Sequence, residues 1–406
     1  MRVVVVTFEI ADRLKGLPQP ATIAMSARAR ALRAQGVDVI SLALGEPDFA
    51  SPPEAVEAAA QAGREGDTRY PPVGGQPALK QAVIEKFSHE NGLKFTLDQI
   101  LIANGGKQLI FNAFMASLNA GDEVIVPAPY WVSYPIIAKM MGGVPVEAIC
   151  REEDGFRLSA EALRRAITSR TRWLVLNFPN NPSGAIMERA DLEAIADILR
   201  QAPHVWILAD EIYEHLTFDG RSHVSLAAVA PDLADRILTV NGMAKAYAMT
   251  GWRVGFAGGP LPLIRAMTSV QSNATSGVCT LAQAGAVAAL QTSPVRRDGM
   301  RDIYQKRRDQ VVTALRAIPG LTCAMPDGAF YAYPGLVGLI GKRTQNGREI
   351  RTDLDFAEAL LDAEYVATVP GSAFGLSPHI RLSCAASEVQ LREACQRIER
   401  FVRSLS

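Results

Sequence analysis

The sequence predicts an α/β fold, with a large domain built on a mostly parallel mixed sheet between helices and a smaller α+β domain formed by both chain ends. Short apolar segments alternate with amphipathic segments over the first three quarters of the chain, as strands alternate with helices in such folds. The apolar segments contain few polar residues, which is typical of parallel strands covered by helices on both faces. The last quarter mixes the two patterns less regularly.

The elements of the large domain follow from this alternation and from the turn residues between them. Gly36 ends the first amphipathic segment, because a glycine in the left-handed conformation commonly ends a helix. The turn residues at 119–122 separate a helix from the next strand. Strands are expected at 37–42, 100–103, 123–126, 173–176, 205–209, 237–240 and 254–257, and helices at 21–35, 54–62, 77–90 and 108–118.

The C-terminal elements and the domain boundaries follow from the change of pattern near residue 295. A long charged helix is expected at 295–317, with strands at 330–333, 366–369 and 380–383 and helices at 355–361 and 388–405. We assign residues 1–55 to an N-terminal segment of the small domain, 56–295 to the large domain and 296–406 to the C-terminal small domain.

The composition excludes several classes of protein. Hydrophobic residues make up 48% of the 406 residues, which is too many for a disordered chain. The 42 basic and 42 acidic residues cancel, so a nucleic-acid or membrane-surface binder is not expected. No apolar run approaches the ~18 residues that a membrane span needs.

The cysteines and histidines show no metal-binding pattern. The five cysteines are spread along the chain without CxxC spacing, so we expect neither a zinc site nor a disulfide framework. The five histidines lack metal-ligand spacing, and we predict structural or surface roles for them and no metal. This cysteine usage fits a cytoplasmic protein.

Polar residues follow the ends of several predicted strands, where α/β proteins place their sites. Gly105, Gly106 and Lys107 stand between a strand and a helix, where backbone N–H groups can bind an anion. Alone, such a sequence is more often a simple turn. Asn181 lies in a loop that two prolines make rigid, and an ordinary turn is again the alternative.

The next two strand ends supply a carboxylate, a phenol, an amine and a guanidinium. Asp210 and Tyr213 follow an apolar strand, so the carboxylate should face a cation or a donor, or else form an internal salt bridge. Lys245 has apolar neighbours that should lower its pKa, and a neutral lysine amine forms Schiff bases with carbonyl groups. Arg253 follows eight residues later.

Together these groups match the needs of pyridoxal 5′-phosphate. Its phosphate requires backbone donors and a cation such as Arg253, and its aldehyde requires a lysine such as Lys245. Its ring nitrogen requires a carboxylate, which Asp210 could supply.

Eight phrases of the sequence resemble, in order and spacing, those of the class I pyridoxal-phosphate aminotransferases of fold type I, in the aspartate/prephenate branch. The phrases are LGEPDF (44–49), NGGKQ (104–108), PYWVSYP (129–135), NFPNNPSG (177–184), DEIYEHL (210–216), AKAYAMTGWRVG (244–255), VPGSAFG (369–375) and HIRLSCA (379–385). The resemblance runs from about residue 22 to the C-terminus, and residues 1–8 lie outside it. It implies an enzyme that transfers amino groups between amino acids and 2-oxo acids.

The resemblance implies a role for each matching residue. Lys245 would bind the cofactor covalently and move the proton, and Asp210 would contact the ring nitrogen. Tyr213 and Asn181 would donate hydrogen bonds to the phenolic oxygen, and Trp131 would stack on the ring. Gly105, Gly106 and Arg253 would bind the phosphate, with Lys107 nearby, and Tyr70 would reach the phosphate of the neighbouring subunit in a homodimer. For the substrate, Arg381 binds the α-carboxylate, Gly45 closes over it, and Trp131 and Asn181 lie beside it.

The sequence departs from the family near the lysine. Gly242 and Ala244 stand where the family often has phosphate-binding serines. We expect those contacts to come from elsewhere, for example from Ser276 or nearby residues of the partner chain.

The preferred substrate is expected to be acidic. In the branch that this chain resembles, a lysine and a threonine at the positions of Lys107 and Thr22 bind a distal carboxylate. This implies L-aspartate or L-glutamate as donor and 2-oxoglutarate or oxaloacetate as acceptor. Prephenate or aromatic substrates stay open, as do C–S lysis or decarboxylation on the same cofactor and a non-enzymatic regulator with this fold.

Overall fold

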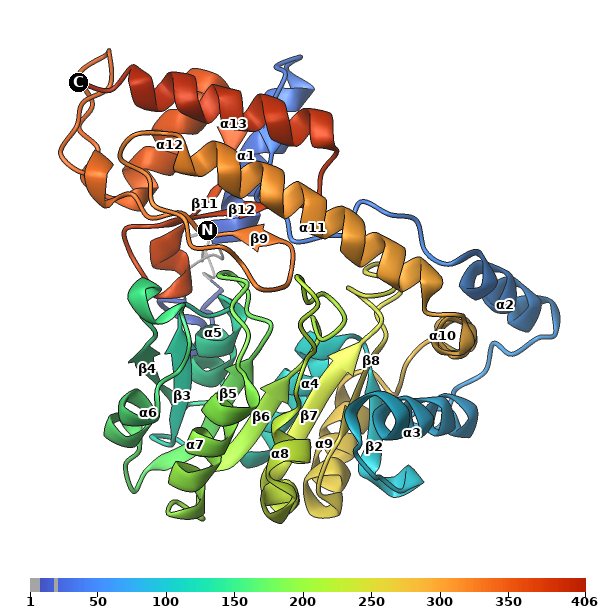
Figure 1. Ribbon diagram of the computed structural model, residues 1–406. Helices are drawn as coiled ribbons and strands as arrows, with labels where there is room; N and C mark the ends of the chain where they lie inside the picture. The colour runs from blue at the N-terminus through green and yellow to red at the C-terminus, as the bar shows by residue number, and fades with distance from the viewer. Residues whose placement is uncertain (1–7, 18–20) are drawn as a thin grey trace, which may run out of the picture.

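A seven-stranded sheet between helices carries a smaller unit along the edge where most of its strands end (Figure 1). The computed structural model describes residues 8–17 and 21–406, with the side chains of residues 21 and 22 left out. The helices are α1 Ala21–Ala34, α2 Pro53–Arg64, α3 Pro77–Asn91, α4 Gly106–Ser117, α5 Ser133–Met140, α6 Ala160–Ala166, α7 Arg189–Arg200, α8 Leu226–Val229, α9 Leu261–Ala274, α10 Thr280–Gln291, α11 Val295–Arg316, α12 Asp353–Glu364 and α13 Glu388–Arg403.

The large sheet is mixed but mostly parallel, as predicted. Its strands lie in the order β2-β8-β7-β6-β5-β3-β4, and only β8 runs antiparallel to its neighbours. The strands are β2 Ile100–Ala103, β3 Glu123–Ala128, β4 Val144–Ile149, β5 Thr171–Asn177, β6 Trp206–Asp210, β7 Ile237–Gly242 and β8 Gly255–Gly258. The parallel strands β5, β6 and β7 therefore end at one edge, where their last residues can share a site.

Both faces of this sheet are buried, which explains why its strands are so apolar. Val124 and Val126 of β3 pack into one apolar cluster with residues of α4, α5 and α9. Ile125 between them points the other way, into a cluster with residues of α6, α7 and α8. In Figure 1, α6, α7 and α8 accordingly lie in front of the sheet, and α4 and α5 lie behind it.

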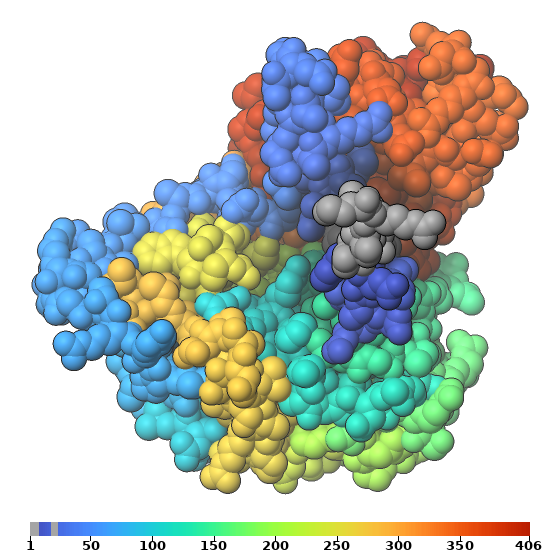
Figure 2. Space-filling view, turned by 180° about the vertical axis from the view of Figure 1, so that it is seen from behind, coloured from blue at the N-terminus to red at the C-terminus, as the bar shows by residue number. Residues whose placement is uncertain are grey.

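The smaller unit joins both ends of the chain, as predicted. Its antiparallel strands β9 Tyr331–Ala332, β11 Val369–Pro370 and β12 Ile380–Ser383 are covered by α12 and α13. The N-terminal strand β1 Ile40–Ser41 pairs in parallel with β10 Val366–Ala367. In Figure 2 the described residues 8–17 lie against the large unit, and η1 (Asp12–Leu14) contacts α5.

Three predicted strands are shorter or divided in the structure, and β4 had no counterpart in the prediction. The segment 330–333 forms ladder pairs only at Tyr331 and Ala332. The segment 37–42 forms ladder pairs only at Ile40 and Ser41. The segment 366–369 is divided, because Val366 and Ala367 pair with β1 whereas Val369 pairs with β12 in another sheet. Within the described residues, no helix is both long and apolar enough to cross a membrane.

Candidate active site

A cavity of about 390 Å³ lies between the ends of β5, β6 and β7 and the smaller unit. It brings together residues that are far apart in the sequence. The predicted site residues that line it are Gly45, Gly106, Lys107, Trp131, Asn181, Asp210, Tyr213, Lys245, Arg253 and Arg381. Tyr70 is not part of its lining, and the side chain of Thr22 lies outside the described residues.

Lys245 points into this cavity from the turn that follows β7. Its Nζ donates a hydrogen bond to the carbonyl oxygen of Gly45 at 2.5 Å and lies 5.6 Å from the ring centres of Tyr213 and Phe330. Burial, together with the positive charge of Arg381, lowers the pKa of Lys245 to about 8. The amine is therefore neutral far more often than that of an ordinary lysine, as the sequence predicted.

Asp210 is the last residue of β6, and its carboxylate is buried beside the cavity. It accepts hydrogen bonds from the hydroxyl of Tyr134 at 2.7 Å and from the backbone N–H of Ile212 at 3.3 Å. Burial raises its pKa to about 6, although both hydrogen bonds oppose the rise. The carboxylate of Asp210 forms no ion pair with any described residue. The alternative prediction of an internal salt bridge is therefore wrong within the described residues.

The start of α4 forms a concave turn beside Arg253. Gly105 has a φ of 82°, and a Cβ on it would overlap the guanidinium group of Arg253. That guanidinium donates to the carbonyl oxygens of Thr250 at 3.0 Å and Asn104 at 3.2 Å. The first backbone N–H groups of α4 and a fixed cation thus converge on the cavity, which suits an anion.

Lys107 adds a second cation to the same end of the cavity. Its Nζ lies 4.9 Å from the ring centre of Trp131, which meets Tyr134 edge-on. Burial and the nearby charge of Arg253 lower the pKa of Lys107. Lys107 forms no ion pair with a described residue. An anion bound between Lys107 and Arg253 would therefore reduce the repulsion between their positive charges.

Arg381 enters the cavity from β12 of the smaller unit. Its guanidinium donates to Asn181 Oδ1 at 2.9 Å and to the carbonyl oxygen of Ala43 at 2.6 Å. It also lies over the rings of Tyr331 and Phe374, at 4.6 and 4.9 Å from their centres. Strand alternation predicts this direction, because Ile380 and Leu382 on the other face pack into the core.

Two tyrosines of the site had no role in the prediction. Tyr134 holds the carboxylate of Asp210, and the hydroxyl of Tyr331 lies 2.8 Å from that of Tyr213. Tyr134 lies in the quoted phrase 129–135, one helical turn after Trp131, which is the signal that could have found it. Tyr331 shows no comparable signal, because its partners come from segments far away in the chain.

Tyr70 and Ser276 lie apart from the cavity, in a second surface hollow. Tyr70 is 93% exposed, and this hollow is lined by residues 68–71 and 275–281. Local packing explains why residue 242 is a glycine, because a Cβ at this position would lie only 2.9 Å from the carbonyl oxygen of Val254. A serine at 242 would therefore force β7 and β8 apart.

The sequence and the fold both match known aminotransferases. The family profile described as aminotransferase class I and II matches residues 37–398. The chain belongs to this aminotransferase family. The enzyme is 49% identical to an aspartate aminotransferase of Rhizobium meliloti, over 96% of this chain and 95% of that protein. It is 48% identical to an aspartate/prephenate aminotransferase of Cereibacter sphaeroides, over 98% and 99%.

Solved structures of aminotransferases superpose closely on the enzyme. A crystal structure of the Rhizobium meliloti aspartate aminotransferase has a TM-score of 0.96 at 48% identity, covering 98% of this chain and all of that one. The Thermus thermophilus aspartate aminotransferase with maleate has a TM-score of 0.91 at 43% identity, over 97% and 100%. Fold type I is therefore confirmed.

Pyridoxal 5′-phosphate is the cofactor of this family, and the cavity of the aminotransferase fits it. The turn at Gly105 and the guanidinium of Arg253 suit its phosphate. The buried carboxylate of Asp210 forms no ion pair with the described residues and suits a protonated ring nitrogen. The desolvated amine of Lys245 suits its aldehyde.

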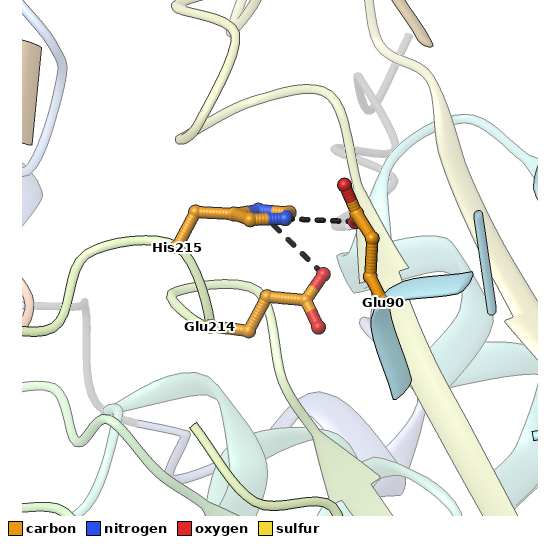
Figure 3. A group of neighbouring side chains, drawn as sticks. All are labelled: Glu90, Glu214 and His215. Carbon is orange, nitrogen blue, oxygen red and sulfur yellow. Dashed lines mark hydrogen bonds and ion pairs between the residues drawn. The ribbon is translucent and has the colours of Figure 1, made fainter. Parts of the chain in front are cut away.

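A network of charged side chains surrounds Glu214 and His215, the two residues that follow Tyr213 in the sequence (Figure 3). Glu214 forms an ion pair with Lys86, and His215 lies between Glu214 and Glu90, with its Nε2 2.9 Å from Glu90 Oε2. Arg297 of α11 donates to Glu90 at 2.8 Å. The positive charge of Lys86 and neighbouring histidines holds the pKa of Glu214 well below its usual range.

Ligand atoms of two carboxylates and one histidine lie within 4.8 Å of one another at two places among the described residues. One group is Glu90, Glu214 and His215, and the other is Glu211, Glu214 and His223. Lys86 and Arg297 already supply positive charge to the first group. We therefore interpret His215 as a structural residue.

The charge of Glu214 is expected to stabilise the enzyme at neutral pH. Glu214→Gln removes the buried anion of Lys86 and leaves it only the longer ion pair with Glu90 at 3.5 Å, so it should cost up to about 3–5 kcal/mol. Because the folded pKa of Glu214 is lowered, its contribution is fully present above the unfolded value near ~4.3 and is lost progressively as the pH falls from there through the folded pKa. Thermal unfolding at pH 7 and at the lowest pH where the wild type stays folded measures both effects.

The control for that experiment is Glu57→Gln, which removes an exposed ion pair with Arg64. Exposed pairs contribute little, so this variant should unfold near the wild-type temperature at both pH values. Equal losses for the two variants would contradict the structural role of Glu214.

The lowered pKa of Lys245 should be visible in the cofactor-free enzyme. Labelling by an aldehyde with borohydride reduction should rise with pH through a midpoint near 8, because only the neutral amine reacts. Peptide mass spectrometry quantifies labelling at Lys245, with the exposed Lys94 as internal reference. The same midpoint for both lysines would show that Lys245 is not desolvated.

Proposed function

We propose that this aminotransferase transfers an amino group from L-aspartate or L-glutamate to a 2-oxo acid such as 2-oxoglutarate or oxaloacetate. The observation that carries the proposal is the pair of cations, Arg381 and Lys107, which line the same cavity as Lys245. A dicarboxylate could place its α-carboxylate on Arg381 and its distal carboxylate on Lys107. The relatives named aspartate aminotransferase support this choice.

We assign the remaining roles from the contacts in the cavity. Tyr213 and Asn181 are proposed to donate to the phenolic oxygen of the cofactor, and Trp131 to stack on its ring. Gly45 is proposed to lie over the bound substrate, with its carbonyl oxygen beside Lys245. Thr22 remains part of the proposal for the distal carboxylate.

The residues of the chain can then carry the reaction as follows. When bound, pyridoxal 5′-phosphate supplies an electron sink for the negative charge that develops on the substrate Cα. Arg381 orients the substrate so that the Cα–H bond faces Lys245. The neutral amine of Lys245 removes that proton and later delivers it to the neighbouring carbon of the cofactor. The cycle has two half-reactions and ping-pong kinetics.

Movement of the smaller unit is proposed to exclude water during these steps. We propose domain boundaries at 55/56 and 295/296, so that α1 and β1 of the N-terminal segment move together with residues 296–406. The parallel pairing of β1 with β10 supports their coupling. Substrate held between Arg381 and Lys107 would draw the two domains together.

The functional unit is proposed to be a homodimer in the cytoplasm. The tyrosine ring of Tyr70 is almost fully exposed and would reach the phosphate in the neighbouring subunit. Ser276 shares its hollow and would supply the contact that Gly242 and Ala244 cannot make. The five free cysteines support a reducing compartment.

Prephenate is a second candidate for the amino acceptor. The name of the Cereibacter sphaeroides relative includes aspartate and prephenate. Prephenate also carries two carboxylates, so Arg381 and Lys107 would suit it equally. Assays with aspartate as donor should therefore compare 2-oxoglutarate with prephenate.

The role of Lys107 is tested by the choice of amino donor. Lys107→Ala should raise KM for aspartate about ten- to a hundredfold, the cost of a lost charged hydrogen bond, with little change for alanine. Steady-state kinetics with 2-oxoglutarate as acceptor measure both values. The control is Lys139→Ala, an exposed lysine on α5. Equal changes for aspartate and alanine would refute the distal-carboxylate role.

The role of Tyr70 is tested by mixing two inactive variants. Lys245→Ala and Tyr70→Ala should each lose activity, but mixed dimers contain one site with both residues intact. Unfolding and refolding the two variants together should restore part of the activity. Activity that stays at the level of the separate variants would argue against a residue shared between subunits.

A further inference from the structure

The hydroxyls of Tyr213 and Tyr331 are hydrogen-bonded to each other at the cavity. Their oxygens are 2.8 Å apart, and both side chains are buried. Neither hydroxyl has another hydrogen-bond partner among the described residues. A phenol carries one proton, so only one of the two can donate across this contact at a time.

Tyr331 is fixed on two further sides. The guanidinium of Arg381 lies over its ring, 4.6 Å from the centre. The backbone of Gly45 packs directly against its hydroxyl, and a Cβ on Gly45 would overlap that oxygen. Tyr331 therefore touches a substrate-binding arginine, the loop that carries Gly45 and a cofactor-binding tyrosine at once.

We infer that Tyr331 is a positioning residue that donates its proton to the oxygen of Tyr213, so that the proton of Tyr213 is directed at the phenolic oxygen of the cofactor. This inference rests on the proposed function, in which Tyr213 donates to that oxygen. Because Tyr213 has a single proton, the proton in the 2.8 Å contact must then come from Tyr331.

The environments of the two phenols favour this direction of donation. Burial raises the pKa of both tyrosines, and the positive charge of Arg381 opposes the rise in both, but the pKa of Tyr213 is raised further, which leaves Tyr331 the better donor. A hydroxyl that accepts a hydrogen bond also becomes a stronger donor itself. Tyr331 thus strengthens the contact between Tyr213 and the cofactor without touching the cofactor oxygen.

The test is Tyr331→Phe in the cofactor-loaded enzyme. The variant keeps the ring under Arg381, so KM for the amino donor should change little, whereas kcat should fall about two- to tenfold. The pH midpoint of the visible absorbance change should rise, because a hydrogen bond to the phenolic oxygen favours the deprotonated cofactor. Tyr333→Phe is the control, since that hydroxyl donates to the carbonyl oxygens of Leu376 and Gly371.

The same substitution in a Tyr213→Phe background decides whether Tyr331 acts through Tyr213. There, Tyr331→Phe should change neither kcat nor the absorbance midpoint further. An equal effect in both backgrounds, or no effect in the wild-type background, would overturn the inference. Failure of the proposed function would be seen separately, as absent transamination by the wild type or as a midpoint that Tyr213→Phe leaves unchanged.

Discussion

An excess of positive charge in one cavity governs the rest of this site. Lys107, Lys245, Arg253 and Arg381 line it, whereas its only carboxylates among the described residues are those of Asp210 and Glu46. Burial and mutual repulsion lower the pKa of both lysines. Anions that enter such a cavity reduce this repulsion, and the phosphate of the cofactor and the carboxylates of a substrate are anions of the right charge.

The fold assembles these charges from two directions. Asp210 lies at the end of β6, and the turn that carries Lys245 follows the end of β7. The segment between these strands contains Glu214, whose buried ion pair with Lys86 stabilises it. The smaller unit supplies Arg381 from the opposite side. The proposed reactive lysine and the proposed substrate-binding arginine thus belong to different parts of the chain, and the movement proposed between these parts would control access to the amine.

Much of this arrangement could be predicted from the sequence because it is encoded locally. The apolar segments 100–103 and 380–383 form strands with those bounds, and the residues after the strand ends meet in one cavity. The contacts of Tyr331 and the network of Glu214 could not be predicted, since their partners are distant in sequence. The strand at 37–42 was overestimated because only Ile40 and Ser41 find a pairing partner.

The pairing of β1 with β10 has a consequence for how the enzyme matures on the ribosome. The loop with Gly45 is translated early, yet its neighbours Tyr331 and Arg381 emerge hundreds of residues later. The seven-stranded sheet can form during synthesis, but its N-terminal flank must wait for the last strands. A nascent chain that stops before β12 would therefore contain Lys245 but lack Arg381, the residue proposed to bind the α-carboxylate of the substrate.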